Sequence, residues 1–293
     1  MSRSLSALVL LHGLLLVAPE AHAEKDQFVH VTPGGVEQPV FVGFPNDIGR
    51  DHPVVFVMHG VRRNADEYRD QWLELAERHG FLLVVPEFSD AAFPGAAGYN
   101  LGNVYDEEGT IRPRADWAFA AIDPLFDAVR TRYRVTAEHY SIYGHSAGAQ
   151  FVHRFLMHVP EARVARAVAA NAGWYTMPDF NVALPYGLQG SAVSEGDLNR
   201  ALRQPLTILL GEADTDPDDP NLRRTDEAME QGPHRLYRGR AFYEAALIAA
   251  GQAGVALNWN LVTVPEVGHD NARMAPAAVP FLARLKPQAD NPD

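Results

Sequence analysis

The 293-residue chain contains no cysteine. This absence excludes a cysteine nucleophile, thiolate-bound zinc and iron–sulfur clusters, which all require the thiol side chain. It also excludes disulfide bonds, so the core must stabilise the fold without covalent cross-links. With 47% hydrophobic and 21% charged residues, the composition is that of a globular protein, and the length suits one large domain.

Basic residues are outnumbered: 25 Lys and Arg stand against 37 Asp and Glu, which gives a formal net charge of −12. Proteins that bind nucleic acids need Lys and Arg to neutralise phosphate groups. The charge balance therefore argues against a nucleic-acid partner.

Long hydrophobic runs are missing except near the N-terminus, where Leu5 to Val17 is mostly apolar. Arg3 precedes this run, and Ala21-His22-Ala23 follows it as a small-x-small cleavage site. This is the pattern of a secretory signal peptide, and it predicts a secreted or periplasmic protein with no membrane span after processing. An uncleaved anchor is the alternative, but the run is short for a bilayer. We expect three segments: a signal peptide at 1–23, a folded domain at 24–286 and a disordered tail at 287–293.

Apolar, β-branched runs alternate with segments of helical spacing along most of the chain. We expect strands at Gln27–Val31, Val40–Phe44, Val54–Met58, Phe81–Val85, Tyr140–Tyr143, Val164–Ala170, Pro205–Leu210 and Leu257–Val264. We expect helices at Glu67–His79, Trp117–Arg132, Ala147–His158, Phe242–Ala250 and Pro276–Leu285. Pro124 lies inside the second of these, so that helix either starts at Asp123 or kinks there. The alternation predicts an α/β fold: a mostly parallel central sheet with helices on both faces, antiparallel N-terminal strands and loop insertions over the site.

The pentapeptide Gly144-His145-Ser146-Ala147-Gly148 joins a predicted strand to a predicted helix. A sharp turn at this point pushes the Ser146 hydroxyl out of the backbone, where a base and a substrate carbonyl can both reach it. The two glycines leave room where strand and helix crowd together. The motif therefore predicts Ser146 as a nucleophile.

A serine nucleophile needs a base, usually a histidine held by a carboxylate. In open α/β sheets the reacting groups lie beyond the carboxyl ends of the strands. Asp214 follows one late strand and His269 follows the last one. The order Ser146, Asp214, His269 is that of the α/β-hydrolases and differs from the orders in chymotrypsin and subtilisin. Asp216 and Glu212 are alternative acids.

Two backbone N–H groups are expected to bind the oxyanion that develops during acyl transfer. One belongs to Ala147, which follows the nucleophile. The other belongs to Val61, because His59-Gly60-Val61 begins the loop after the strand at 54–58. An ordinary glycine at the end of a strand is the alternative for Gly60.

The loop after the strand at 205–210 is rich in carboxylates. Alternating carboxylates can bind Ca²⁺, but this loop lacks the glycine and glutamate of an EF-hand. We interpret it as a solvated turn that contributes one carboxylate to the site, and we expect no metal. Its acidic residues are Asp214, Asp216, Asp218 and Asp219.

Substrate contacts are expected from polar and aromatic residues near the strand ends and in the long irregular segment 89–114. The aromatic residues have an alternative role as core residues beneath a long loop. Segments 176–200 and 217–237 are rich in Pro, Gly and polar residues and could cover the site. In the second segment, we expect Arg223 and Arg224 either to bind an acidic group of the substrate or to lie on the solvated surface. The predicted substrate-binding residues are His59, Tyr99, Asn100, His145, Trp174 and Tyr175.

These motifs resemble the α/β-hydrolase superfamily and, within it, bacterial secreted proteins related to poly(3-hydroxyalkanoate) depolymerases and feruloyl esterases. The segments Gly98–Asn103 and Ala169–Tyr175 are similar to one such subgroup. The resemblance covers essentially the whole mature chain. It implies the fold, a serine-hydrolase mechanism and no cofactor, but it does not settle the substrate, because this fold hosts many chemistries. We expect a serine esterase that acts on a small-molecule or oligomeric ester. Extracellular depolymerases often carry disulfides, so the lack of cysteine favours a soluble ester over a solid polymer. A secreted peptidase or amidase, or a non-catalytic binding protein on the same scaffold, remains an alternative.

Overall fold

The computed structural model describes residues 23–46 and 48–283. Nearly all of the predicted signal peptide and the whole of the predicted C-terminal tail lie outside these described residues. Within them, none of the helices combines the length and hydrophobicity that crossing a bilayer requires.

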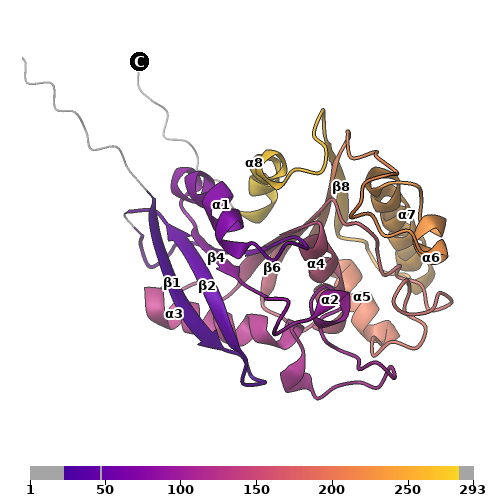
Figure 1. The fold of residues 1–293 in the computed structure, drawn as a ribbon, viewed down its shortest axis with the longest axis horizontal. Helices are drawn as coiled ribbons and strands as arrows, with labels where there is room; N and C mark the ends of the chain where they lie inside the picture. The colour runs from indigo at the N-terminus through magenta and orange to yellow at the C-terminus, as the bar shows by residue number, and fades with distance from the viewer. Residues whose placement is uncertain (1–22, 47, 284–293) are drawn as a thin grey trace, which may run out of the picture.

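An eight-stranded sheet forms the centre of the described chain, with the strand order β1-β2-β4-β3-β5-β6-β7-β8 (Figure 1). The pairs β1–β2 and β2–β4 are antiparallel, and the other pairs are parallel. This is the predicted α/β architecture. The strands are β1 (Glu24–Val31), β2 (Glu37–Phe44), β3 (Val54–Met58), β4 (Leu82–Pro86), β5 (Tyr140–His145), β6 (Val164–Ala170), β7 (Leu206–Gly211) and β8 (Trp259–Val264).

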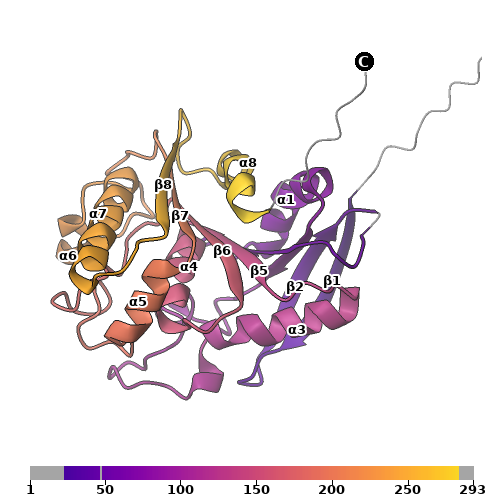
Figure 2. The same ribbon diagram turned by 180° about the vertical axis from the view of Figure 1, so that it is seen from behind.

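Helices cover both faces of the sheet (Figure 2). The first and last α-helices, α1 and α8, pack on one face, and α3, α4, α5 and α7 pack on the other. Because both faces are covered, the residues of β3, β4, β5 and β7 are all buried, which explains the continuous apolar runs of β3 and β4. The helices are α1 (Ala65–His79), α2 (Gly95–Gly98), α3 (Ile122–Tyr133), α4 (Ala147–His158), α5 (Glu195–Arg203), α6 (Asp226–Glu230), α7 (Arg235–Ala253) and α8 (Asn271–Leu282), with 3₁₀ turns η1 (Arg114–Asp116) and η2 (Phe119–Ala121).

Several helices differ from their predicted bounds. The helical spacing begins at 117, but the helix starts at Ile122, one residue before the start at Asp123 that Pro124 indicated. Pro124 thus lies in the first turn, where its missing N–H costs no hydrogen bond. The last helix begins five residues before Pro276 and keeps two prolines inside it. Helix α5 was not predicted, although Ser194 and Asp197 form a capping box at its start. That Ser-x-x-Asp signal was available in the sequence.

Candidate active site

A strained turn between β5 and α4 presents Ser146. Its backbone has φ 58° and ψ −115°, a region that residues with a side chain rarely adopt. The two flanking glycines make this turn possible. A Cβ on Gly144 would lie 2.1 Å from the carbonyl oxygen of Gly148, and a Cβ on Gly148 would lie 2.1 Å from that of Met58. The predicted sharp turn is therefore confirmed, and only glycine fits at positions 144 and 148, two residues before and two residues after the serine.

Replacing Gly148 by alanine is expected to damage both folding and activity. The added methyl group must push α4 away from β3, which costs about 1–3 kcal/mol of unfolding free energy and moves the serine. Gly251→Ala is the matched control, because its Cβ meets nothing within 4 Å and it lies in α7, where alanine stabilises a helix by about 0.5–1 kcal/mol. Urea denaturation and steady-state kinetics of both variants test this. Equal stability of Gly148→Ala and the unsubstituted protein would contradict the close packing.

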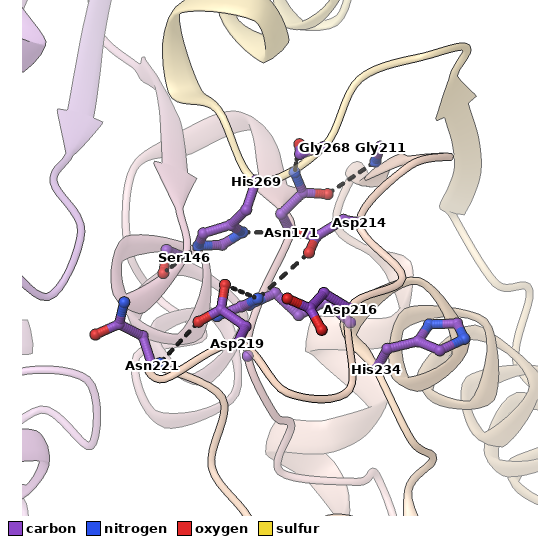
Figure 3. Close-up of polar contacts among 12 residues, drawn as sticks. Ser146, Asn171, Gly211, Asp214, Asp216, Asp219, Asn221, His234, Gly268 and His269 are labelled. Carbon is purple, nitrogen blue, oxygen red and sulfur yellow. Dashed lines mark hydrogen bonds and ion pairs between the residues drawn. The ribbon is translucent and has the colours of Figure 1, made fainter.

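Three side chains from distant parts of the chain meet in a line of hydrogen bonds (Figure 3). His269 Nε2 lies 2.9 Å from Ser146 Oγ, and His269 Nδ1 lies 2.8 Å from Asp214 Oδ2. The Asp214 side chain is 3% exposed, whereas His269 is 21% exposed. The alternative acids do not take this position: Asp216 is exposed and accepts from the backbone of Asp218. Geometry thus brings together the three residues that the sequence order predicted.

A residue that sequence reasoning missed, Asn171, ties the strand of the acid to the loop of the histidine. Its side-chain oxygen accepts a hydrogen bond from the Gly211 N–H at 2.8 Å, and its Nδ2 donates to the Gly268 carbonyl at 3.1 Å (Figure 3). Asn171 itself has a φ of 52°, a conformation that asparagine tolerates better than most residues. An asparagine directly after a strand was the signal that could have pointed to this bridge.

A pocket of 280 Å³ opens over Ser146, and most of its wall is polar. Val61, which is 56% exposed, forms part of the rim. Ala147 is the first residue of α4, so its N–H has no acceptor within the helix. Both residues predicted to bind the oxyanion therefore lie beside the serine. The pocket residues are Gly60, Val61, Arg62, Asn64, Glu67, Tyr68, Gln71, His145, Ser146, Asn221, His269, Asp270 and Asn271.

His145 is the one predicted substrate-binding residue that lines this pocket, although little of it is exposed. Its Nδ1 lies 3.1 Å from the Tyr68 hydroxyl, and its ring centroid lies 4.6 Å from that of His269. Burial, followed by the nearby His269 and Arg235, lowers the pKa of His145 well below its ordinary value. A neutral His145 avoids adding a second positive charge beside His269.

His59 and Tyr99 lie in the core and do not line the pocket. The His59 ring joins the loops after β3 and β4, since Nε2 accepts from the Phe88 N–H at 3.0 Å and Nδ1 contacts the Gly60 carbonyl. Its burial lowers the pKa of His59 to about 3. The Tyr99 hydroxyl donates to the His59 carbonyl at 2.8 Å, and Arg63 stacks on the Tyr99 ring. Both side chains are fully buried in this arrangement, so the structure does not place them on the pocket wall, and their contact with substrate stays a prediction.

Asn100, Trp174 and Tyr175 are also buried and lie outside the pocket wall. Asn100 donates to Gln150 at 3.0 Å, and Tyr175 stacks on Phe242 with ring centroids 4.5 Å apart. The structure therefore packs these three side chains against other parts of the protein, and their contact with substrate also stays a prediction.

Two arginines stack on the Trp174 ring. The guanidinium groups of Arg154 and Arg223 lie 4.1 and 4.8 Å from its centroid. Arg224 instead pairs with Asp218 at the surface. Arg223 is thus occupied by aromatic neighbours and does not line the pocket over Ser146.

The two segments predicted to cover the site differ in their positions. Segment 217–237 reaches the pocket through Asn221, whereas no residue of 176–200 lines it.

Among the described residues, no group of three His, Asp or Glu side chains has an arrangement that could hold a metal ion.

Comparison with known proteins supports the same fold. Residues 43–183 match the family model described as esterase PHB depolymerase. A poly(aspartic acid) hydrolase from Sphingomonas sp. KT-1 is 44% identical, with a TM-score of 0.85 over 87% of this chain and 96% of that one. A poly(3-hydroxybutyrate) depolymerase from Bordetella parapertussis is 38% identical, with a TM-score of 0.83 over 89% of this chain and 91% of that one.

More distant structures share the fold alone. A fluorophosphonate-binding serine hydrolase from Staphylococcus aureus is 15% identical, with a TM-score of 0.56 over 87% of this chain and 95% of that one. No curated protein is significantly similar to the chain. With two relatives above 30% identity along nearly their whole length, the chain belongs to the PHB depolymerase esterases, a family of α/β-hydrolases, and is a carboxylic ester hydrolase.

Proposed function

We propose that this esterase cleaves its substrate through an acyl-enzyme on Ser146, with His269 as general base and Asp214 as the acid that orients it. The observation that carries the proposal is the unbroken line of hydrogen bonds from the serine hydroxyl through the imidazole to the buried carboxylate. A nucleophile, a base and an orienting group in this geometry are the parts that serine-dependent acyl transfer requires.

The reaction proceeds in two steps. Ser146 Oγ attacks the ester carbonyl while His269 Nε2 takes its proton, and the N–H groups of Ala147 and Val61 bind the oxyanion. His269 then gives that proton to the leaving alcohol, and the acyl group stays on the serine. Water, activated by the same imidazole, releases the acid and restores the serine. Asp214 holds Nδ1–H throughout and stabilises the imidazolium.

The pocket favours a short or polar substrate. Its volume of 280 Å³ lies at the lower end of ligand sites, and side chains such as Asn64, Gln71 and Asn221 line it. We propose a small-molecule or oligomeric ester whose acyl part carries hydrogen-bonding groups. Hydrolysis rates for a series of p-nitrophenyl esters should fall with increasing alkyl length beyond short chains. A preference for long alkyl esters would contradict this assignment.

Amide hydrolysis is the second candidate. The observation that favours it is the 44% identity to a protein described as a poly(aspartic acid) hydrolase. The same serine, histidine and oxyanion donors can cleave an amide. Matched ester and amide substrates with one acyl group separate the two functions by their ratio of kcat/KM.

Replacing Asp214 by asparagine tests the acid. Asparagine keeps the shape but cannot hold the imidazole as a carboxylate does, so kcat is expected to fall roughly 10⁴-fold. Asp216→Asn is the matched control, since it lies two residues away on the same loop and is exposed. Steady-state kinetics at neutral pH measure both. A larger loss in Asp216→Asn would assign the acid to that residue.

We further propose that residues 1–23 direct export and are removed before Glu24. The support is the pattern of a charged start, an apolar run and the Ala21-His22-Ala23 site. Mass spectrometry of the exported protein should find Glu24 at its N-terminus, and retention of Met1 would contradict the proposal.

A further inference from the structure

A buried arginine lies behind the catalytic carboxylate. Arg235 is the first residue of α7, and its side chain is 1% exposed. One guanidinium nitrogen, Nη1, lies 3.3 Å from Asp214 Oδ1 and 3.0 Å from Asp219 Oδ2. The other oxygen of Asp214, Oδ2, is the one that contacts His269. The two oxygens of the carboxylate are thus divided between the arginine and the histidine.

Asp219 connects this arginine to the substrate pocket. Its carboxylate also accepts a hydrogen bond from the Asn221 N–H at 2.7 Å, and Asn221 lines the pocket over Ser146 (Figure 3). The hydrogen bond from Arg235 is the largest cause that lowers the pKa of Asp219, so this carboxylate is ionised beside the arginine. The backbone also joins the two elements, because the Leu236 N–H donates to the Asp214 carbonyl at 3.2 Å. Arg235 therefore contacts the loop that follows β7 at two points: at Asp214, the proposed acid, and at Asp219, which is hydrogen-bonded to the pocket residue Asn221.

We infer that Arg235 is a positioning residue of this esterase: it fixes the Asp214 carboxylate for His269 and, through Asp219, sets the charge that the imidazole experiences. This inference rests on the proposed roles of His269 and Asp214. The guanidinium of Arg235 contacts the carboxylates of both Asp214 and Asp219, and the negative charge of Asp219 balances its positive charge. Removing the charge of Arg235 and removing the charge of Asp219 therefore change the net charge near His269 in opposite directions.

The sign of each change follows from the charges around His269. Activity requires a neutral imidazole, so kcat/KM rises with pH through an acid limb. Losing the positive charge of Arg235 favours the imidazolium and moves the acid limb to higher pH. Losing the negative charge of Asp219 disfavours the imidazolium and moves the limb to lower pH. The charged or titratable groups facing His269 or its pocket are Asp214 and Asp219 after β7, His145 at the end of β5, Arg235 on α7, Arg62, Glu67 and Tyr68 from the β3–α1 region, and Asp270 in its own loop.

The test compares four variants of the full-length protein: Arg235→Gln, Arg235→Lys, Asp219→Asn and the exposed control Asp216→Asn. For Arg235→Gln we expect kcat/KM to fall up to about 100-fold at neutral pH, since small displacements of catalytic groups cost this much. Its acid limb should move upward by about one pH unit, as expected for losing a nearby charge. Arg235→Lys keeps the charge and should restore most of the pH profile. Asp219→Asn should move the limb downward and raise KM more than it lowers kcat.

The outcomes separate the inference from a structural role and from the proposed function. Thermal melting checks that each variant folds. If Arg235→Gln does not fold, Asp219→Asn still tests the inference, because the Asp219 side chain is 19% exposed and its replacement disturbs the core less. A lower kcat in Arg235→Gln with an unchanged acid limb would overturn the inference, as would shifts of both variants in one direction. A limb in Asp219→Asn no different from that of Asp216→Asn would also overturn it. Full activity in Asp214→Asn would instead reject the proposed function.

Discussion

Replacing Ser146 by alanine is expected to lower kcat roughly a millionfold, the loss seen when a serine nucleophile is removed from such a triad. In the proposed mechanism the hydroxyl forms the acyl-enzyme, and none of the other pocket residues is a serine. Steady-state kinetics on an activated ester measure the loss. Labelling with a fluorophosphonate gives a second readout, because the probe phosphonylates the serine oxygen and should leave the variant unlabelled.

The serine variant should fold as well as the original protein. Alanine also has a Cβ, so it inherits the same backbone strain at a φ of 58° and relieves none of it. Ser191→Ala is a matched control, since Ser191 does not line the pocket. Labelling that persists in Ser146→Ala would show that another residue is the nucleophile.

Replacing His269 by alanine is expected to lower kcat by a similar factor, because the serine hydroxyl then has no base within reach. His145 does not substitute for it: its Nδ1 contacts the Tyr68 hydroxyl, and its ring lies beside His269 in a position that does not complete the line to Asp214. The remaining rate should still exceed that in water by about 10³-fold, through the oxyanion donors and substrate binding.

The pH profile distinguishes this variant from one that is merely misfolded. The acid limb that reports a titrating imidazole should disappear, whereas His139→Ala, at an exposed position, should keep both rate and profile. Normal turnover in His269→Ala would remove this residue from the mechanism. The combined variant Ser146→Ala/His269→Ala should lose little more than either single one, since the two act as a unit.

The parts of this site that the sequence predicted are those with a local signal. Ser146 has a glycine two residues before it and another two residues after it in a strand-to-helix turn, and the apolar runs of β3 and β4 follow directly from burial on both faces. Asp214 and His269 could be placed because parallel strands end at one edge of the sheet. None of these inferences needed a side-chain contact between distant residues.

The parts that the sequence did not reveal depend on how loops pack. Tyr99 and Tyr175 look alike in sequence whether they face a ligand or the core, and only the folding of the long segments over the sheet buries them. Arg235 contacts Asp214 and Asp219 in the loop after β7, and no local pattern marks it. Asn171 directly follows a strand, but that signal does not reveal its partner Gly268, which lies 97 residues later. Helix α5, by contrast, had a capping signal at Ser194 and Asp197, but that signal lies in the segment 176–200, whose Pro, Gly and polar residues suggested an irregular loop.

The unfavourable backbone of Ser146 has a consequence for how this enzyme changes under selection. Glycine is the residue that this turn accommodates most readily, so Ser146→Gly would relax the fold and abolish the nucleophile in one step. Stability and turnover are therefore opposed at this residue. A directed-evolution experiment that screens for heat resistance alone would enrich inactive chains here, and thermostable descendants should be sought with the serine held fixed.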